Sequence, residues 1–545
     1  MESAASVGWQ AWPAEVPSVP APHAAPVHPE QDPASLSIDP SAQPVPAAGT
    51  SRRAAAAPSA SAAPSVSGGR DKLDPRTKTV IGLLLVSSFV VILNETIMSV
   101  ALPRLMADLD ISAGTAQWLT TGFMLTMAVV IPATGFLLQR FSMRGLFLTA
   151  MSLFSAGTLL AALAPGFGTL LGGRVIQAGG TAIMLPLLMT TVLNAVPAHR
   201  RGQMMGTISI VIAVAPAIGP TVSGIILNAL DWRWMFWLVL PIALLSLILG
   251  AVKVQNLTET KRVPFDVLSI VLSTFAFGGL IFGLSSIGEA AQGKELMPLW
   301  IPLTIGVLAM AGFVLRQLVL QRTDSALMDL RTFASKPFVV AIVMVLVSMM
   351  ALFGCLIVLP LYLQNVLGLD TLHTGLLLLP GGAVMAILSP IVGNLFDRFG
   401  PRPLVIPGAV VLSGALWGMT LLTDETPTGL VILLHCLLNA GLGFIFTPLF
   451  TSALGSLDKS LYSHGSAIIN TLQQLAGAAG TAVFITLMTT GTTAALADGA
   501  SAVGAAASGV HTAFFWGAAV SLVAVAASFF VRRPTNELPE GLAAH

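Results

Sequence analysis

Charged residues are scarce in this sequence. Of its 545 residues only 9% are charged, 55% are hydrophobic, and the mean hydropathy is +0.84. A soluble domain usually carries about 25% charged residues, which cover its surface in water. So little charge excludes a soluble globule and indicates a chain whose solvent is largely lipid. The net charge of +1 gives no indication of nucleic-acid binding.

Cysteine is also scarce. The two cysteines, Cys355 and Cys436, both lie inside apolar runs. Two such thiols indicate neither a disulfide framework nor a metal site, so we expect both to be small core residues. We predict no metal site and no cofactor.

The beginning of the chain has no long apolar run. Residues 1–75 are rich in Ala, Pro and Ser, as in "SRRAAAAPSASAAPSVSGG". Such a segment cannot bury enough apolar surface to offset the entropy lost on ordering. We predict a disordered cytoplasmic tail, with a linker, a species-specific extension or a misplaced start codon as its origin. It is not a signal peptide, because no apolar region follows a charged start.

Long apolar runs recur between residues 79 and 531. A bilayer core of about 30 Å needs roughly 20 apolar residues in helical form. The runs are longer than barrel strands and do not alternate, which excludes a closed β-barrel. We predict an all-α integral membrane protein. Its fourteen transmembrane helices are expected at 79–101, 115–138, 146–164, 168–190, 203–227, 234–252, 266–286, 299–318, 337–360, 374–396, 402–422, 428–450, 465–489 and 511–531.

The 26 Lys and Arg residues predict the orientation of these spans. Cytoplasmic loops of membrane proteins carry an excess of Lys and Arg. With a cytoplasmic amino terminus, the outer side holds only Arg104, Arg233 and Lys294, and Arg174 lies within a span. All the others then fall on the cytoplasmic side. We predict a multi-pass protein of the plasma (inner) membrane with both termini cytoplasmic.

Two segments are near copies of each other. "GFLLQRFSMRG" begins at Gly135 and "GNLFDRFGPRP" begins at Gly393. The first follows the second predicted span and the second follows the tenth, which indicates two six-helix halves separated by two inserted helices. Such duplicated halves usually enclose a central binding site in secondary transporters. The predicted parts are the tail, an N-terminal half at 76–253, inserted helices and linkers at 254–335, a C-terminal half at 336–533 and a C-terminal tail at 534–545.

Several motifs resemble those of the major facilitator superfamily. The two copies are similar to its motif A, "LGGRVIQAGGTAIMLP" (171–186) to motif B, and "APAIGPTVSGIIL" (215–227) to motif C. "LNETIMSVALP" (93–103) resembles the first-helix motif of its fourteen-helix drug:proton antiporters, in particular the lincomycin-resistance subgroup. The resemblance covers about residues 79 to 531. It implies gating roles for Gly135, Arg140, Arg144, Gly219, Pro220, Gly224, Gly393, Asp397, Arg398 and Arg402, although ordinary close packing of the glycines and prolines is the alternative.

The sequence departs from the family pattern at two important positions. Gln139 stands in the first motif A where Asp is usual, and Asp397 keeps the Asp in the second. The charged contacts by which this motif holds the two halves together are therefore expected to be weaker, or to use different partners, in the first copy. Asn94 takes the usual Asp position of the first-helix motif, and Glu95 follows it, about 100° further around the helix.

Glu95 and Arg174 are the predicted proton-coupling residues. A charge at mid-bilayer costs about 2.5–3.5 kcal/mol on insertion scales, and a carboxyl group avoids most of that cost by binding a proton. Helix rise puts both residues in the outer half of the bilayer, where they meet if the first and fourth spans are neighbours. The alternative for Glu95 is a permanent pairing that holds helices together, and the alternative for Arg174 is a permanent structural ion pair or a clamp on backbone carbonyl groups.

Other polar residues on the spans are candidate substrate contacts. Asn470 and Gln474, four residues apart, are expected to share one helix face. The alternative is that such groups hydrogen-bond neighbouring helices to each other. The predicted substrate-binding residues are Asn94, Glu95, Gln177, His435, Asn439, Asn470 and Gln474.

The resemblance implies a proton-coupled multidrug efflux antiporter that works by alternating access. Its partners would be protons, the lipid bilayer and amphipathic, cationic or weakly basic drugs, with lincosamides among the candidates. Neither nucleic acid nor an obligatory protein partner is expected, and no nucleotide-binding loop suggests ATP. The main alternative is an exporter or importer of one specific metabolite on the same fold, such as an endogenous antibiotic, a siderophore or an amino acid. A membrane enzyme or receptor is disfavoured, because no cluster of His, Asp or Glu lies near either face.

Overall fold

The described part of the chain is almost entirely helical. The computed structural model describes residues 74–111, 113–256, 266–290 and 297–532. The tail predicted at 1–75 lies outside these residues except for its last two positions, and the tail predicted at 534–545 lies wholly outside them.

Six long helices come first. They are α1 (Pro75–Leu109), α2 (Ala113–Arg140), α3 (Met143–Ala162), α4 (Phe167–Ala195), α5 (Arg201–Ala229) and α6 (Trp234–Lys253), with the short 3-10 helix η1 (Ala198–Arg200) before α5. We refer to α1–α6 as the N-terminal half.

Two more helices precede the second set of six. They are α7 (Val267–Ala290) and α8 (Trp300–Leu320), followed by η2 (Gln321–Thr323) and η3 (Leu330–Ala334). The C-terminal half is α9 (Lys336–Asn365), α10 (Thr371–Phe399), α11 (Arg402–Met419), α12 (Thr428–Gly455), α13 (Tyr462–Ala497) and α14 (Ala502–Ser528), with η4 (Lys459–Leu461) before α13.

Fourteen helices in the described ranges are long and apolar enough to cross a membrane, which confirms the predicted number. Several extend well beyond the predicted spans. For example, the span predicted at 465–489 lies within α13, which runs from Tyr462 to Ala497. The apolar run marks the length that lipid must cover, whereas backbone hydrogen bonding continues beyond it at both ends.

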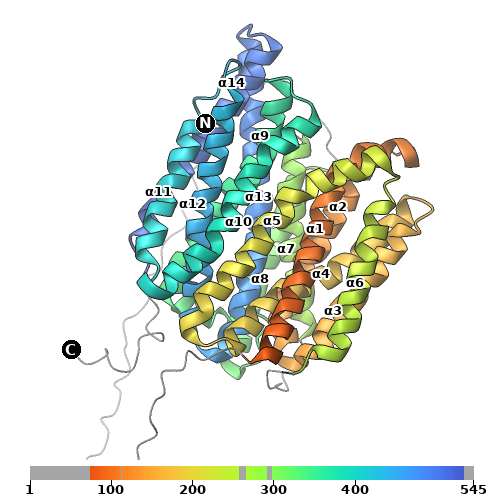
Figure 1. The fold of residues 1–545 in the computed structure, drawn as a ribbon, viewed down its shortest axis with the longest axis vertical. Coiled ribbons are helices and arrows are strands. Elements are labelled where there is room, and N and C mark those ends of the chain that lie inside the picture. The colour runs from red at the N-terminus through yellow and green to blue at the C-terminus, as the bar shows by residue number, and fades with distance from the viewer. Residues whose placement is uncertain (1–73, 112, 257–265, 291–296, 533–545) are drawn as a thin grey trace, which may run out of the picture. The chain divides into compact units, whose positions relative to one another are not determined.

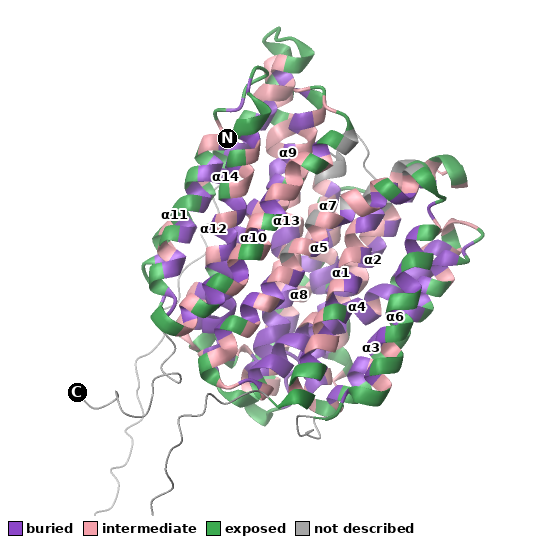
Figure 2. Ribbon diagram, viewed as in Figure 1, coloured by how far each residue is buried: buried purple, intermediate pink, exposed green. Residues whose placement is uncertain are grey.

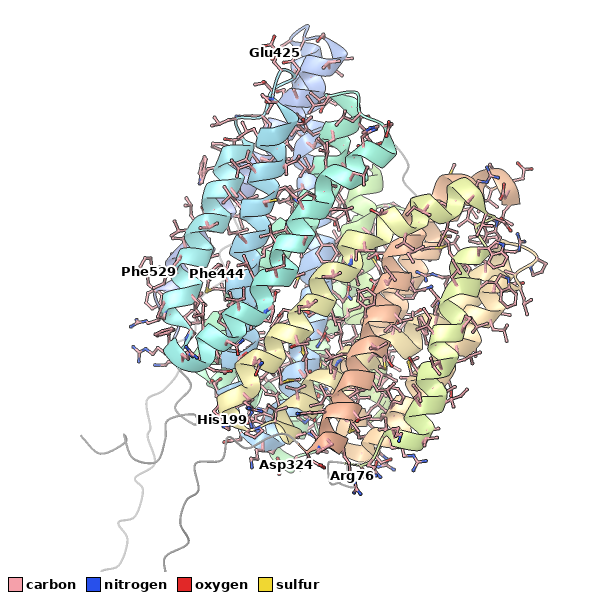
Figure 3. All side chains as sticks on the ribbon, in the orientation of Figure 1. Arg76, His199, Asp324, Glu425, Phe444 and Phe529 are labelled. Carbon is pink, nitrogen blue, oxygen red and sulfur yellow. The ribbon has the colours of Figure 1, made fainter. Side chains whose placement is uncertain are left out.

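Consecutive long helices run in opposite directions, so each connection lies at one of two ends of the bundle. We call the end where α1 begins the tail end and the other the far end. Arg76, His199 and Asp324 lie together at the tail end, and Glu425 lies at the far end (Figure 3).

The helices pack as two sets that meet along two seams. Within the sets, α3 packs on α4 and α6, and α11 packs on α12 and α14. Across the sets, α5 lies along α10, and α2 contacts α13 (Figure 1). The inserted helix α7 packs against α8 and also against both α2 and α13, so it covers the second seam.

The seam between α5 and α10 depends on glycine at its tail end. A Cβ added to Gly202 would lie 2.6 Å from the carbonyl oxygen of Gly393, and one added to Gly393 would lie 2.9 Å from the carbonyl carbon of Gly202. A Cβ on Gly206 would lie 3.0 Å from the Cα of Pro390. The two backbones therefore touch directly at these glycines.

Apolar side chains occupy both the interior and much of the outer surface. Buried residues line the contacts between helices, and exposed residues follow the outward faces of helices such as α3, α6 and α11 (Figure 2). On α8, Val307, Leu308 and Leu315 are all more than half exposed, at 58%, 67% and 65%. Lipid is the solvent that such faces require.

A polar clasp fixes the inserted pair at the tail end. The guanidinium of Arg316 donates to both carboxylate oxygens of Asp266, at 3.1 and 3.2 Å. These hydrogen bonds hold the pKa of Asp266, which lies just before α7, below its usual range. The buried side chain of Gln317 donates to Ser269 and accepts from the backbone N–H groups of Leu327 and Met328. The clasp therefore joins α7, α8 and the segment that leads into α9.

Candidate functional site

A cavity of about 200 Å³ lies between the two halves. Helices α1, α4 and α5 line one side, and α9, α10, α12 and α13 line the other. Most of its wall is apolar. Its polar side chains are those of Glu95, Thr96, His435, Asn439, Gln473 and Gln474.

Glu95 is the one carboxylate among the described residues that line this cavity. It is partly buried, in the middle of α1. The next residue, Thr96, is held against α5: its hydroxyl contacts the carbonyl oxygen of Ala215 at 3.3 Å, and Gly219 leaves the space that Thr96 fills. This packing fixes the rotation of α1 and turns Glu95 toward the cavity.

Arg174 lies behind Glu95 and is only 1% exposed. Its Nη1 donates to Asn94 Oδ1 at 2.9 Å and to Gln177 Oε1 at 2.8 Å. Its Cζ lies 4.0 Å from the centre of the Phe123 ring, a cation–π contact. Gln177 in turn donates to Thr158 on α3 at 2.7 Å. The guanidinium is therefore clamped between α1, α2 and α4.

The predicted meeting of Glu95 and Arg174 takes an indirect form. The described hydrogen bonds of Arg174 go to Asn94 and Gln177, and none goes to Glu95. Arg174 nevertheless acts on the Glu95 carboxyl group through space. The cavity carboxylate thus has a fixed positive charge nearby without being locked to it.

The opposite wall of the cavity holds one histidine and three amide side chains. Asn439 donates to the carbonyl oxygen of His435 one turn earlier, at 2.9 Å. Gln473 and Gln474 reach the cavity from α13, and Gln473 Nε2 has no hydrogen-bond partner among the described residues. These groups can donate hydrogen bonds to a molecule in the cavity.

The predicted substrate contacts therefore divide into two groups. Glu95, His435, Asn439 and Gln474 line the cavity, whereas Asn94, Gln177 and Asn470 do not. Asn94 and Gln177 are occupied by Arg174, as described above. Asn470 is 4% exposed, donates to the carbonyl oxygen of Ser466, and contacts Met189 on α4.

Sequence reasoning missed the apolar wall. Met349, Leu352, Phe353 and Leu356 line the cavity from α9. Their spacing of three or four residues is the repeat of one helix face, and this pattern was a usable signal. In a helix that is apolar all round, however, the same spacing also fits other faces.

The second motif A reaches across the halves through Asp397. Its two carboxylate oxygens accept from the backbone N–H groups of Gly202 at 2.9 Å and Gln203 at 3.0 Å, in the first turn of α5. A carboxylate at this point satisfies N–H groups that have no partner within the helix and complements the helix dipole.

Arg144 and Arg402, the last arginines of the two motifs, contact their own halves. Arg144 donates to the carbonyl oxygen of Ala251 at the end of α6, at 2.7 Å. Arg402 donates to the carbonyl oxygen of Phe529 just after α14, at 2.8 Å. Each therefore fastens the last helix of its half. Arg140 and Arg398 are exposed at the tail end.

The residues of motif C lie on α5. Gly219 packs on Thr96, as described above. A Cβ on Gly224 would meet no atom within 4 Å, so close packing does not explain that glycine. Pro220 lies inside the helix, and Pro216, one turn earlier, lines the cavity. The gating roles predicted for these residues stay predictions.

Comparisons with known proteins agree with this architecture. A family model described as the Major Facilitator Superfamily matches residues 84–481. The lincomycin resistance protein LmrB of Bacillus subtilis is 41% identical over 456 residues, which are 83% of this chain and 95% of that protein. A multidrug resistance protein B homolog of Mycobacterium tuberculosis is 30% identical over 427 residues, 77% of each chain.

Two solved structures share the fold. The human organic anion transporter MFSD10 superposes with a TM-score of 0.60 at 13% identity, over 84% of this chain and 100% of that one. The proton:xylose symporter XylE superposes with a TM-score of 0.58 at 18% identity, over 86% and 99%. The resemblance predicted from the motifs is confirmed, and the chain belongs to the Major Facilitator Superfamily of membrane transporters.

Proposed function

We propose that this chain is a multidrug efflux antiporter of the plasma membrane. It exports amphipathic, cationic or weakly basic compounds in exchange for protons. The names of its relatives, which refer to lincomycin resistance and multidrug resistance, support the substrate class. A largely apolar cavity with a few hydrogen-bonding groups suits compounds of varied shape.

The observation that carries the proposal is that Glu95 is the one carboxylate among the described residues of the cavity wall. Glu95 can bind either a proton or the cationic group of a substrate, and each neutralises the same charge. Binding a proton therefore removes the attraction that holds the substrate, and releasing the proton restores it. This competition couples export of the substrate to entry of the proton, because Glu95 binds only one of the two at a time.

Arg174 has a supporting role in this proposal. We assign to it the role of a fixed counter-charge for the Glu95 carboxylate. Because Asn94, Gln177 and Phe123 hold the guanidinium in place, it keeps that position while the cavity empties and fills. Arg174 thus acts on Glu95 without contacting the substrate.

The arrangement of Lys and Arg supports a cytoplasmic tail end. The hydrogen bonds described between the two halves gather at that end. In two of them the backbone N–H of Gly202 donates to Asp397, and the hydroxyl of Thr447 donates to Ser209. The conformation would then be closed toward the cytoplasm, the state in which an exporter releases its substrate and takes up a proton.

The proton gradient supplies enough free energy for this exchange. One charge that crosses the membrane potential yields about 2.3 kcal/mol per 100 mV. That free energy corresponds to about a fiftyfold concentration ratio.

The decisive experiment measures efflux of a cationic dye from energised proteoliposomes. Glu95→Gln keeps the shape of the side chain and removes its proton exchange, so proton-driven export should fall to the level of protein-free liposomes. Glu95→Asp should keep partial activity. Glu425→Gln, at the far end (Figure 3), is the matched control and should export like the wild type.

Full proton-driven export by Glu95→Gln would falsify the coupling mechanism. A panel of dyes and antibiotics tests the substrate class separately. Export of a single compound from the whole panel would contradict the multidrug proposal and favour the specific-metabolite alternative.

A further inference from the structure

The two copies of motif A meet the opposite half through different chemistry. The second copy uses the Asp397 carboxylate on the first turn of α5, as described above. The first copy has Gln139 at the corresponding position, near the end of α2, and so has no negative charge to offer. Its partners lie at the start of α13.

Gln139 is hydrogen-bonded to a histidine. Its Nε2 lies 2.6 Å from Nε2 of His464, and 3.4 Å from the carbonyl oxygen of Ser460, to which it donates. These two partners come from the other half of the protein, more than 300 residues away in the sequence. The contact is therefore a direct link between the halves at the tail end.

The site is built to receive the histidine ring. His464 is 5% exposed. A Cβ added to Gly135, the first glycine of the motif, would lie 3.2 Å from His464 Nδ1 and 3.4 Å from the Cβ of Ala467. That is tighter than normal packing, so the glycine makes the space that α13 needs to approach α2.

The hydrogen-bond pattern fixes the form of the ring. Because Gln139 Nε2 donates to Ser460, the same amide nitrogen also faces His464, and His464 Nε2 must accept. The ring proton is then on Nδ1.

We propose that His464 is the positioning residue that closes the first repeat, and that the Gln139–His464 pair replaces the carboxylate latch used in the second. The pair holds α2 and α13 together at the tail end while the cavity is open elsewhere. The proposal concerns closure alone, and His464 belongs to none of the motifs found in the sequence. It rests on the proposed function only in taking this closure as one step of transport.

The two latches should differ in strength. A hydrogen bond that involves an ionised group is roughly twice as strong as a neutral one. Asp397 makes two such bonds, whereas Gln139 and His464 share one neutral bond. The first repeat is therefore the weaker side of the closure and the side that separates first.

Cys355 provides a natural reporter for the test. Cys355 lines the cavity and is only 1% exposed, so a reagent from the tail end can reach it only after the latch opens. In a Cys436→Ser background it is the sole thiol in the chain. A membrane-impermeant maleimide is applied to vesicles that expose the tail end. Digestion of an epitope tag at the amino terminus identifies those vesicles.

His464→Ala and Gln139→Ala should each raise the rate of tail-end labelling by about three- to tenfold, as expected for the loss of one neutral hydrogen bond. The double variant should label no faster than Gln139→Ala, because that variant already removes the bond that His464→Ala removes. His464→Gln, which can still bond to Gln139, should label at close to the wild-type rate. His199→Ala, an exposed tail-end histidine (Figure 3), is the matched control.

The proposal is wrong if Gln139→Ala labels like His199→Ala, or if the effects of the two single variants multiply in the double variant. Gln139→Ala decides the outcome even if the loss of the buried ring unfolds His464→Ala. Labelling needs neither drug nor proton gradient. A protein that exports no dye can therefore still show this latch, and the two proposals fail independently.

Discussion

The N-terminal half places one carboxyl group, Glu95, in the cavity wall with a buried, hydrogen-bonded arginine behind it, whereas the C-terminal half presents amide, histidine and apolar side chains to the same cavity. On the first side, Arg174 is fixed by Asn94 and Gln177, with Glu95 at the cavity surface. On the second side, Met349 and Phe353 share the wall with Gln473 and Gln474.

This difference indicates a division of labour. A charge in the membrane needs a rigid polar environment, because each unpaired polar group there is expensive. A surface that accepts many compounds needs flexible or apolar groups, and methionine suits this use. We therefore expect the N-terminal half to control proton coupling and the C-terminal half to control which compounds bind.

The largest effect is expected when the carboxyl group is moved from position 95 to position 94. In the double variant Asn94→Asp/Glu95→Gln, the new carboxylate replaces the Asn94 oxygen that accepts from Arg174 at 2.9 Å. The resulting pair should hold the carboxylate ionised and away from the cavity. A charge-assisted hydrogen bond contributes about 1.5–3 kcal/mol, so we expect proton-driven dye export to fall by roughly tenfold to a hundredfold.

Asn94→Asp alone, with Glu95 retained, controls for the effect of the new acid on folding. It should keep more activity than the double variant. Wild-type export by the double variant would show that a carboxyl group at either position can couple. The position of Glu95 in the cavity wall would then have no special importance.

A change in the opposite wall should alter substrates and leave coupling intact. Met349→Ala removes apolar contact from the cavity, and a buried methionine contributes about 1.5–3 kcal/mol when fully enclosed. We expect the apparent affinity to fall by up to about tenfold for some compounds of a panel and to stay unchanged for others. Proton movement per exported molecule, measured with a pH-sensitive dye, should not change.

Val343→Ala, on the exposed side of the same helix, is the control and should leave the panel unaltered. A uniform loss of export for every compound, together with a weaker dependence on the proton gradient, would contradict the assignment of selectivity to this wall.

The smallest effect is expected in the inserted helices, which belong to neither half. Asp266→Asn weakens the bond to Arg316 and should lower the thermal midpoint slightly, without a change in export. Arg316 holds the pKa of Asp266 below its ordinary value. The stabilisation is therefore present above the ordinary carboxyl pKa and is lost as the pH falls through the lowered one.

Thermal unfolding measured at neutral and acidic pH checks this sign. The difference between the wild type and Asp266→Asn should shrink as the pH falls. Asp424→Asn, in an exposed far-end loop, serves as the control. A difference that grows at low pH would show that the clasp is not held by the carboxylate.

Much of the fold could be predicted from the sequence, because lipid imposes a simple length rule on apolar helices. The fourteen spans followed from that rule, and the repeated motif indicated the inserted pair. Glu95 and Arg174 stood out because ionisable groups are rare in such spans. The same rarity explains why Glu95 could be expected to face away from lipid.

The rotation of each helix could not be predicted in the same way. Asn470 and Gln474 were expected to share a face, yet Gln474 lines the cavity and Asn470 packs toward α4. A helix that is apolar on all sides has no strong pattern to fix its rotation. His464 was missed for another reason: its partner Gln139 is 325 residues away, and one histidine in an apolar helix carries no spacing signal.

The bare crossing of α5 and α10 has a consequence for the rate at which the two halves can separate. Where Gly202 and Gly393 meet, backbone lies directly on backbone, so once Asp397 releases the Gly202 N–H, the two glycines part with no side chain of their own to reorder. Contacts of this kind hold two helices close together and still have a low barrier to separation. A larger residue at either position would force α5 and α10 apart. The contact between the helices would then be weaker, and its opening and closing would be slower.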